Sequence, residues 1–231
     1  MTETNEEITA KLNTAWRFFS ARDYVDGFGH ISARTQDPNR ILITPHSLAP
    51  NSKPEDFVLV DLDGNQIGSD AKLPAELPIH LEIYKSRNDV GSVAHFHCAY
   101  ATSFSMSEQN LEPTYFLACI FTGGVPVHPD PKLVLTEERG KALVESLGDH
   151  RAALMRAHGI VVTGDDVIEM TAGVIIMEDN AKRTAIAASM GKFETLGEAE
   201  MAEIGAEIMS GRSLHHRIWS MCEDEVARLY I

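Results

Sequence analysis

The segment His95-Phe96-His97 offers two imidazoles two residues apart. The apolar residues Val90, Val93 and Phe96 predict a buried β-strand here. Side chains two residues apart in a strand point to the same face, so both rings would project together and could bind one metal ion. The alternative is a pair of polar residues on a solvated strand face. The apolar neighbours disfavour that alternative.

A further histidine, His158, lies in the sequence Arg156-Ala157-His158-Gly159 between two apolar stretches. This pattern predicts a tight turn between two short strands. Glycine allows a positive φ and a close approach of backbone, which would suit a side chain placed at a site. Taken alone, such a histidine is more often a turn residue than a ligand.

Glu76 is the acidic residue that could complete the set, and it stands where a helix is predicted to begin. A carboxylate there could simply interact with the helix dipole. His80 follows four residues later and could pair with Glu76 along one helix face. We interpret His80 as structural, with an internal hydrogen bond.

Considered together, these residues predict a divalent metal site formed by His95, His97 and His158, with Glu76 beside it. Three neutral imidazoles leave the charge of the ion unneutralised and a position open for a carboxylate or substrate. Such an ion can stabilise the enolate that forms when a carbon–carbon bond breaks. Glu76 could then move a proton as the catalytic residue.

The elements that must position these residues are short strands flanked by helices. Strands are expected at 30–35, 41–44, 57–62, 66–67, 89–97, 124–128, 152–155 and 160–163, and helices at 5–21, from 76, at 99–106, 136–148, 165–190 and beyond. Thr4 and Glu7 resemble a capping box for the first helix. The pattern predicts one domain over 1–231, a layered α/β sandwich whose sheet is largely antiparallel.

Composition narrows the function classes. The formal net charge is −14, from 34 acidic and 20 basic residues, so nucleic acid and anionic membranes are not expected partners. The three cysteines are scattered, which favours reduced thiols and a cytoplasmic location. Residues Met1–Glu7 are polar and acidic, so no leader peptide is expected.

Five stretches, in this order and spacing, resemble the class II aldolase/adducin family: Gly29-His30-Ile31-Ser32-Ala33-Arg34, Ile43-Thr44-Pro45-His46, Lys72-Leu73-Pro74-Ala75-Glu76, Val93-Ala94-His95-Phe96-His97 and Arg156-Ala157-His158-Gly159. The resemblance covers nearly the whole chain. It implies a three-layer α/β/α sandwich around a mainly antiparallel sheet. It also implies metal ligation by the three histidines, a catalytic role for Glu76, and a homo-oligomer, most often a tetramer.

The departures from the family pattern bear on the substrate. Sugar-phosphate aldolases of this family have Gly-Asn-x-Ser at Gly29–Ser32, Thr-Gly at His46-Ser47, and a serine pair where this chain has only Ala75 before the acidic residue. Those stretches help to bind phosphate. The resemblance therefore implies that Gly29, His30, His46 and Ser47 contact a small anionic or hydroxylated substrate without phosphate.

The stretch Leu111-Glu112-Pro113-Thr114-Tyr115 is closer to the decarboxylase branch of the family, in which Tyr115 would reach a neighbouring site. The leading hypothesis is a decarboxylase of a hydroxy-substituted aromatic, heteroaromatic or keto carboxylate. An aldolase or epimerase acting on a sugar or small hydroxy acid is the alternative, and an iron-dependent oxygenase is a further one. A non-catalytic adducin-type binding module is disfavoured because the ligands are retained.

One divalent ion per chain is expected. Zn²⁺ is the leading candidate, and the ligand set also accepts Mn²⁺, Co²⁺ or Fe²⁺.

Overall fold

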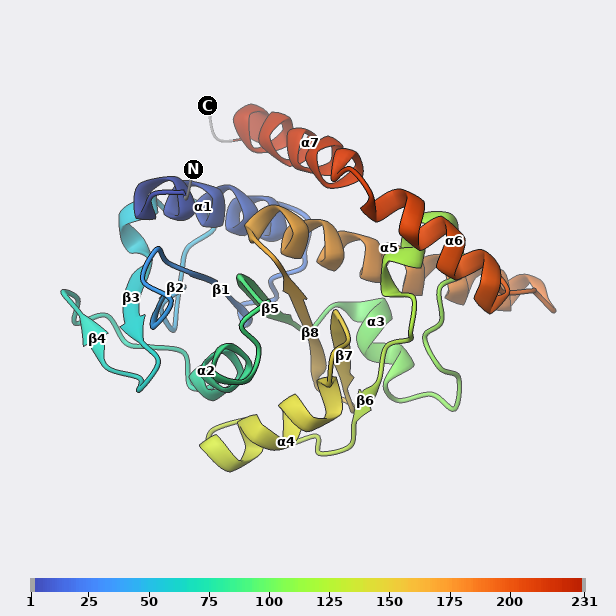
Figure 1. Ribbon diagram of the computed structural model, residues 1–231, viewed down its shortest axis with the longest axis horizontal. Helices are drawn as coiled ribbons and strands as arrows, with labels where there is room; N and C mark the ends of the chain where they lie inside the picture. The colour runs from blue at the N-terminus through green and yellow to red at the C-terminus, as the bar shows by residue number, and fades with distance from the viewer. Residues whose placement is uncertain (1–2, 230–231) are drawn as a thin grey trace.

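A single eight-stranded sheet forms the centre of the protein, which is described here over residues 3–229 of a computed structural model (Figure 1). The strands are β1 (His30–Arg34), β2 (Arg40–Ile43), β3 (Val58–Asp61), β4 (Gln66–Ile67), β5 (Ser92–Phe96), β6 (Val127–His128), β7 (Ala152–Met155) and β8 (Gly159–Gly164). Their order is β4-β3-β2-β1-β5-β8-β7-β6, and the pairs are antiparallel except for the parallel β6–β7 pair.

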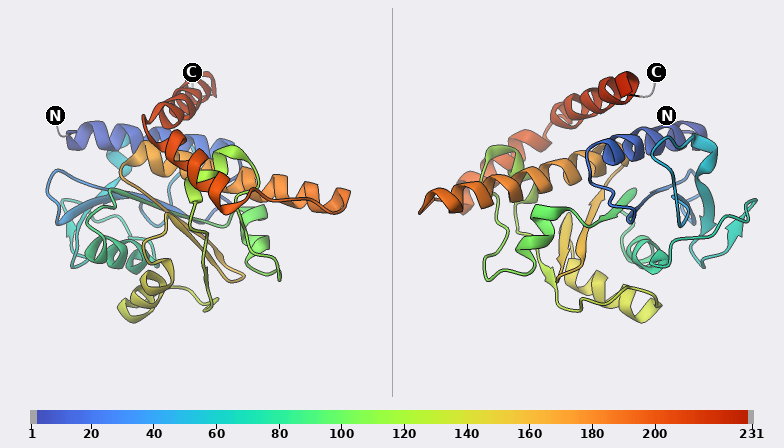
Figure 2. Two further views of the ribbon diagram at one scale, coloured as in Figure 1. Left: turned by 45° about the vertical axis from the view of Figure 1, so that its right-hand side comes forward. Right: turned by 180° about the vertical axis from the view of Figure 1, so that it is seen from behind.

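Helices cover both faces of this sheet. They are α1 (Asn5–Ala21), α2 (Leu77–Ser86), α3 (Ala99–Phe104), α4 (Glu137–Leu147), α5 (Val167–Met190), α6 (Glu198–Met209) and α7 (Ser213–Leu229), with short 3₁₀ turns at Pro54–Asp56 and Phe116–Phe121. Figure 1 shows α1 and α5 on one side of the sheet and α2 and α4 on the other. In Figure 2, α6 and α7 lie outside the α1–α5 layer.

Alternation along the strands divides the core between the two faces. In β5, Ala94 and Phe96 pack with α1 and α5, whereas Val93 packs against α2 and α4. Neighbouring strand residues point to opposite faces, so one buried strand supplies both apolar layers. The predicted three-layer α/β/α sandwich with a mainly antiparallel sheet is therefore confirmed.

Most expected elements form within a few residues of their predicted ends. Helix α1 has the predicted bounds, and Thr4 and Glu7 form the reciprocal capping box. The strand predicted at 89–97 is shorter, because residues 88 and 89 form a turn and pairing begins at Ser92. Met1 and Thr2, at the start of the expected leaderless N-terminus, lie outside the described residues. Within the described chain, none of the helices has the length and hydropathy needed to cross a bilayer.

Candidate metal centre

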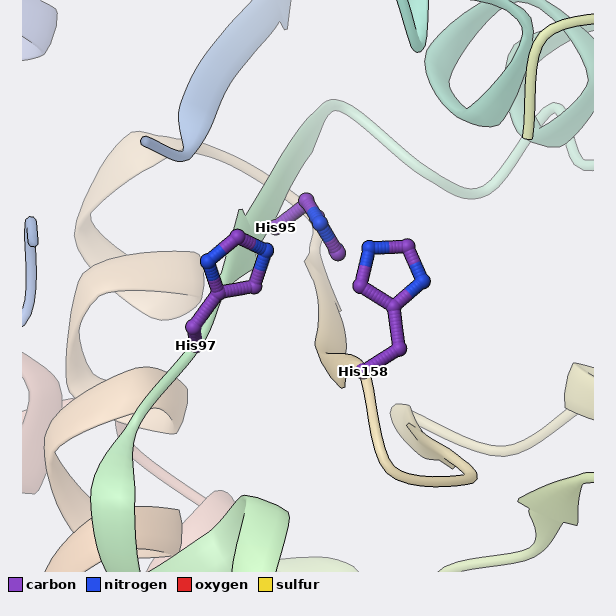
Figure 3. A group of neighbouring side chains, drawn as sticks. All are labelled: His95, His97 and His158. Atoms are coloured by element: carbon purple, nitrogen blue, oxygen red, sulfur yellow. The ribbon is translucent and has the colours of Figure 1, made fainter. Parts of the chain in front are cut away.

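Three histidine rings meet at one end of the sheet. His95 lies in β5, His97 follows that strand by one residue, and His158 precedes β8. The ring centroids of His95 lie 5.2 Å from His97 and 5.0 Å from His158, and those of His97 and His158 are 5.4 Å apart. Figure 3 shows the three rings grouped around one space. One nitrogen from each ring lies within 4.8 Å of the others.

The pairing of β5 with β8 brings these histidines together. Phe96 is opposite Ile160 in that ladder, so the turn containing His158 comes beside His97. Gly159 has the room for this approach only because it lacks a side chain: an added Cβ would lie 2.4 Å from the Phe96 carbonyl oxygen and 2.9 Å from His97 Cδ2. The expected close approach is present, but the positive φ of this turn occurs at Ala157, with φ 53°, rather than at the glycine.

The surroundings of His95 direct its free lone pair toward the other histidines. Its Nδ1 lies 3.0 Å from the carbonyl oxygen of Ile160, which can only accept, so Nδ1 carries the hydrogen. The Nε2 atom is then the basic nitrogen. Burial and the neighbouring His30 keep the pKa of His95 well below its usual value, so the imidazole is neutral and able to ligate.

His97 has a comparable outer partner. Its Nδ1 lies 3.4 Å from Oδ1 of Asp26, which leaves Nε2 for the shared space. A carboxylate behind a ligating imidazole orients the ring and makes it more basic. Asp26 was not singled out from the sequence, because it precedes β1 in a loop with no recognisable motif.

Glu76 completes the group, although it does not cap α2. It occupies the N-cap position, but its side chain makes no capping hydrogen bond. Instead, Oε1 accepts a 2.8 Å hydrogen bond from the backbone N–H of Val134. Its Oε2 lies 3.5 Å from Nε2 of His158 and 3.6 Å from Nε2 of His95. The helix-dipole alternative therefore does not account for where this carboxylate points.

The ionisation of Glu76 reflects competition between burial and its partners. Burial alone would raise its pKa, but the contact with His158, the charge interaction with His95 and the Val134 hydrogen bond lower the pKa to about 2. The carboxylate is consequently anionic at neutral pH. An anionic oxygen beside basic imidazole nitrogens is a suitable donor set for a divalent cation.

Unpaired buried atoms provide a test of whether the residues fit a metal. Nε2 of His95, His97 and His158 is buried in each case and has no hydrogen-bond partner among the described residues. Orphaned buried polar atoms are costly and rare in folded proteins. Two ligands held about 2.1 Å from an ion in tetrahedral geometry lie about 3.4 Å apart, close to the observed 3.5 and 3.6 Å to Glu76. The site fits a small divalent ion.

His30, Glu76 and His95 form a second group whose ligand atoms lie within 4.8 Å of one another. His30 in this group is held by His80, since Nδ1 of His30 lies 2.6 Å from Nε2 of His80. His80 also reaches Oγ of Ser32, at 2.6 Å. It is therefore held internally, as the structural interpretation predicted, but its partners are His30 and Ser32 rather than Glu76.

A pocket of about 220 Å³ opens beside the histidines. Its lining residues are Phe28, Gly29, His30, His46, Pro74, Ala75, Glu76, His97 and Leu133. Apolar and polar side chains therefore both line it. Such a combination is typical of small-molecule sites.

The predicted substrate residues divide into two sets. Gly29, His30 and His46 line this pocket. Ser47 instead lines an adjoining pocket, which His46 also lines. The ring of Tyr115 lies 4.8 Å from the guanidinium carbon of Arg183 and does not line the pocket of its own chain.

Sequence reasoning missed several contributors to the site. The Val134 N–H, the Ile160 carbonyl and the Asp26 carboxylate all hold site residues. Two of these are backbone groups, and because nearly every residue has them, the sequence does not mark which ones will be used. Leu133 and Phe28 are exposed apolar residues, and only their placement at the pocket gives them meaning.

Comparison with known proteins agrees with this architecture. A 3,4-dihydroxyphthalate decarboxylase from Rhodococcus jostii is 27% identical over 94% of this chain and 98% of its own length. An L-fuculose phosphate aldolase from Methanocaldococcus jannaschii is 32% identical over 71% of this chain and 88% of its own length.

Solved structures share the fold. The crystal structure of an aldolase II superfamily protein from Pseudomonas syringae has a TM-score of 0.87 and 24% identity, covering 99% of this chain and 95% of that one. Residues 10–185 match the family described as Class II Aldolase and Adducin N-terminal domain, which is more than half of the chain. The chain belongs to the class II aldolase/adducin family.

Proposed function

We propose that this protein is a divalent-metal-dependent decarboxylase of a hydroxy-substituted aromatic carboxylate. The observation that supports it most directly is the grouping of three unpartnered imidazole nitrogens beside a small pocket that His97 and Glu76 line. Two of these nitrogens, those of His95 and His158, lie 3.6 and 3.5 Å from the Glu76 carboxylate. The relatives named decarboxylase and aldolase are both carbon–carbon lyases, and this chain is an enzyme of that class.

The pocket residues favour decarboxylation over cleavage of a sugar phosphate. Positions that serve phosphate in the aldolases hold His30, His46 and Ala75 here. Phe28, Pro74 and Leu133 add apolar surface that suits a planar ring better than a polyol. Relatives named 3,4-dihydroxyphthalate decarboxylase also align over most of the chain, at 27% identity over 94% and 31% over 90%.

In this proposal His95, His97 and His158 hold the ion, with Zn²⁺ as the leading candidate. The ion would supply positive charge that binds the hydroxyl and carboxylate oxygens of the substrate and stabilises developing negative charge. The apolar lining residues would contact the ring of the substrate, and His30 and His46, which line the same pocket, would contact its oxygens.

Glu76 performs the proton transfer. When the bond between the ring carbon and the carboxylate breaks, carbon dioxide leaves and the electron pair stays on the ring carbon. A new C–H bond must then form with one proton. Glu76 is anionic in the free protein, so it takes up a proton from solvent when substrate displaces it from its present contacts, and then delivers that proton to carbon.

The test is carbon dioxide release from 3,4-dihydroxyphthalate by protein loaded with Zn²⁺ or Mn²⁺, with formation of a dihydroxybenzoate. Activity should disappear with a chelator and return with metal. Fuculose 1-phosphate cleavage is assayed in parallel, because relatives with that activity reach 31–32% identity over about seven tenths of the chain. Aldol cleavage without decarboxylation would contradict the proposal and favour the aldolase alternative.

A further inference from the structure

A continuous chain of buried polar side chains runs from the metal centre into the α2 side of the sheet. Nδ1 of His30 lies 2.6 Å from Nε2 of His80, and Nδ1 of His80 lies 2.6 Å from Oγ of Ser32. Oγ of Ser32 lies 2.8 Å from the phenol oxygen of Tyr84. The four residues are at most 6% exposed, and β1 and α2 contribute two each.

Both imidazoles in this chain are neutral. Burial, together with the nearby His95, lowers the pKa of His80 to about 3. His30 is 6% exposed and its Nδ1 contacts the uncharged ring of His80, so burial disfavours a charged His30 as well. A neutral imidazole has one N–H donor and one acceptor nitrogen, so each hydrogen bond in the chain constrains the next.

The far end of the chain fixes the direction of these hydrogen bonds. Among the described side chains, the hydrogen-bond partner of the Tyr84 phenol is Oγ of Ser32, and the guanidinium of Arg34, 4.8 Å from the Tyr84 ring, brings only donors. Tyr84 therefore has its own hydrogen to donate, and Ser32 Oγ is the acceptor within reach.

The direction set at Tyr84 extends along the hydrogen bonds to the pocket. Ser32 receives from Tyr84 and donates to Nδ1 of His80, so His80 carries its hydrogen on Nε2. That N–H donates to Nδ1 of His30, which then must carry its own hydrogen on Nε2. His30 lines the pocket with Glu76 and His97, and Nε2 is the ring nitrogen not engaged with His80.

We propose that Ser32, His80 and Tyr84 are positioning residues that hold His30 in the Nε2–H tautomer, so that it donates a hydrogen bond to an anionic oxygen of the substrate. A carboxylate or ionised hydroxyl accepts hydrogen bonds and repels a lone pair, so the opposite tautomer would oppose binding. The oxygen-anion ligand class rests on the proposed function, whereas the tautomer does not.

Long-range ¹H–¹⁵N correlation spectra of the zinc-loaded protein with ¹⁵N-labelled histidine report the tautomers directly. In the unaltered chain, both His30 and His80 should carry the hydrogen on Nε2. Ser32→Ala removes the donor to His80, and Tyr84→Phe removes the donor to Ser32 while keeping the ring. Both variants should give mixed tautomers for the two histidines, whereas Ser86→Ala, also on α2, should leave them unchanged.

Binding of 3,4-dihydroxybenzoate to the same zinc-loaded proteins measures the consequence. His30→Ala should weaken binding by about ten- to one-hundred-fold, the range for a hydrogen bond to a charged group. His30→Asn, which restores an N–H donor, should recover most of that loss.

A spectrum with the His30 hydrogen on Nδ1 would overturn the proposal, as would unchanged tautomers in both Ser32→Ala and Tyr84→Phe. Correct tautomers in a protein that releases no carbon dioxide would instead contradict the proposed function alone.

Discussion

The lone pairs of His95, His97 and His158 face a common space where the described residues offer no hydrogen donor to satisfy them. We expect His95→Ala and His97→Ala to reduce bound metal from about one ion per chain to a small fraction, because each removes one of three nitrogen ligands. Metal content by mass spectrometry after purification without chelator provides the measurement, and circular dichroism should show a largely retained fold.

His216→Ala is the matched control for these variants, since His216 is exposed on α7 and far along the chain from the site. It should keep full metal content. Near-stoichiometric metal in both His95→Ala and His97→Ala would mean that the ion binds elsewhere or not at all.

For Glu76, the change to Gln separates proton transfer from shape. The amide oxygen can still accept from the Val134 N–H, but the side chain no longer exchanges a proton. Turnover should fall by roughly 10²–10⁴, the range typical of general acid–base catalysis, while substrate affinity stays within about tenfold. Steady-state kinetics at saturating metal measure both.

A helix-capping role for Glu76 would give the opposite pattern, with near-normal turnover and a loss of about 0.5–2 kcal/mol in the free energy of unfolding. The absence of a capping hydrogen bond from Glu76 already weighs against it.

For single residues, the sequence predicts a role where the type of side chain determines its chemistry. The H-x-H spacing, His158 and Glu76 could be singled out because imidazole and carboxylate are metal ligands, and the structure brings all four together. The His30–His80 contact could not be predicted, since it joins residues fifty positions apart on different elements. Tyr115 was expected at a site, but its place in the chain's own structure is beside Arg183.

At the scale of the elements, the positions of His97 and His158 depend on how closely β8 approaches β5. Gly159→Ala would place a methyl group 2.4 Å from the Phe96 carbonyl oxygen and 2.9 Å from His97 Cδ2, so the strand end must shift. We expect a loss of about 1–3 kcal/mol in the free energy of unfolding, typical of overpacking, and at least about tenfold weaker metal binding. Thermal melts and competitive chelator titrations provide the two measurements.

Gly211→Ala is the control for this substitution, because nothing lies within 4 Å of the added Cβ between α6 and α7. Metal affinity in Gly159→Ala equal to that of the control would show that the strand approach does not position the histidines.

Element types were predictable where local signals were strong. The capping box at Thr4, the apolar face of α1 and the acidic start of α5 each act within a few residues. The edge strand β6 is only two residues long and pairs in parallel with β7, so its existence depends on a distant partner. The start of β5 was predicted too early because the turn at residues 88–89 competes with pairing.

For the whole molecule, the family resemblance predicts the fold class and a metal site. Whether the chain assembles into an oligomer depends on the side chains that it exposes. Several large apolar side chains remain exposed in the single chain: Phe28 at 69%, Met106 at 62%, Phe116 at 59% and Met190 at 83%. Exposed apolar groups of this size are typical of protein contacts when they gather on one surface. Phe116 also adjoins Tyr115, the residue predicted to reach a neighbouring site.

We therefore expect a homo-oligomer, with a solution mass near four times the 25.4 kDa of one chain by size-exclusion chromatography with light scattering. Phe116→Asp places a charge in the expected contact, where an unpaired buried charge is costly, and should shift the mass toward smaller species at micromolar concentration. Leu229→Asp, which changes a similarly exposed residue (56%) at the end of α7, is the control and should keep the larger mass.

If Tyr115 contributes to a neighbouring pocket, Phe116→Asp should also lower turnover at low protein concentration. Part of that turnover should return as the concentration rises, because a weakened contact re-forms by mass action. A monomeric mass for the unaltered protein at micromolar concentration would contradict the expected assembly and leave Tyr115 outside any site.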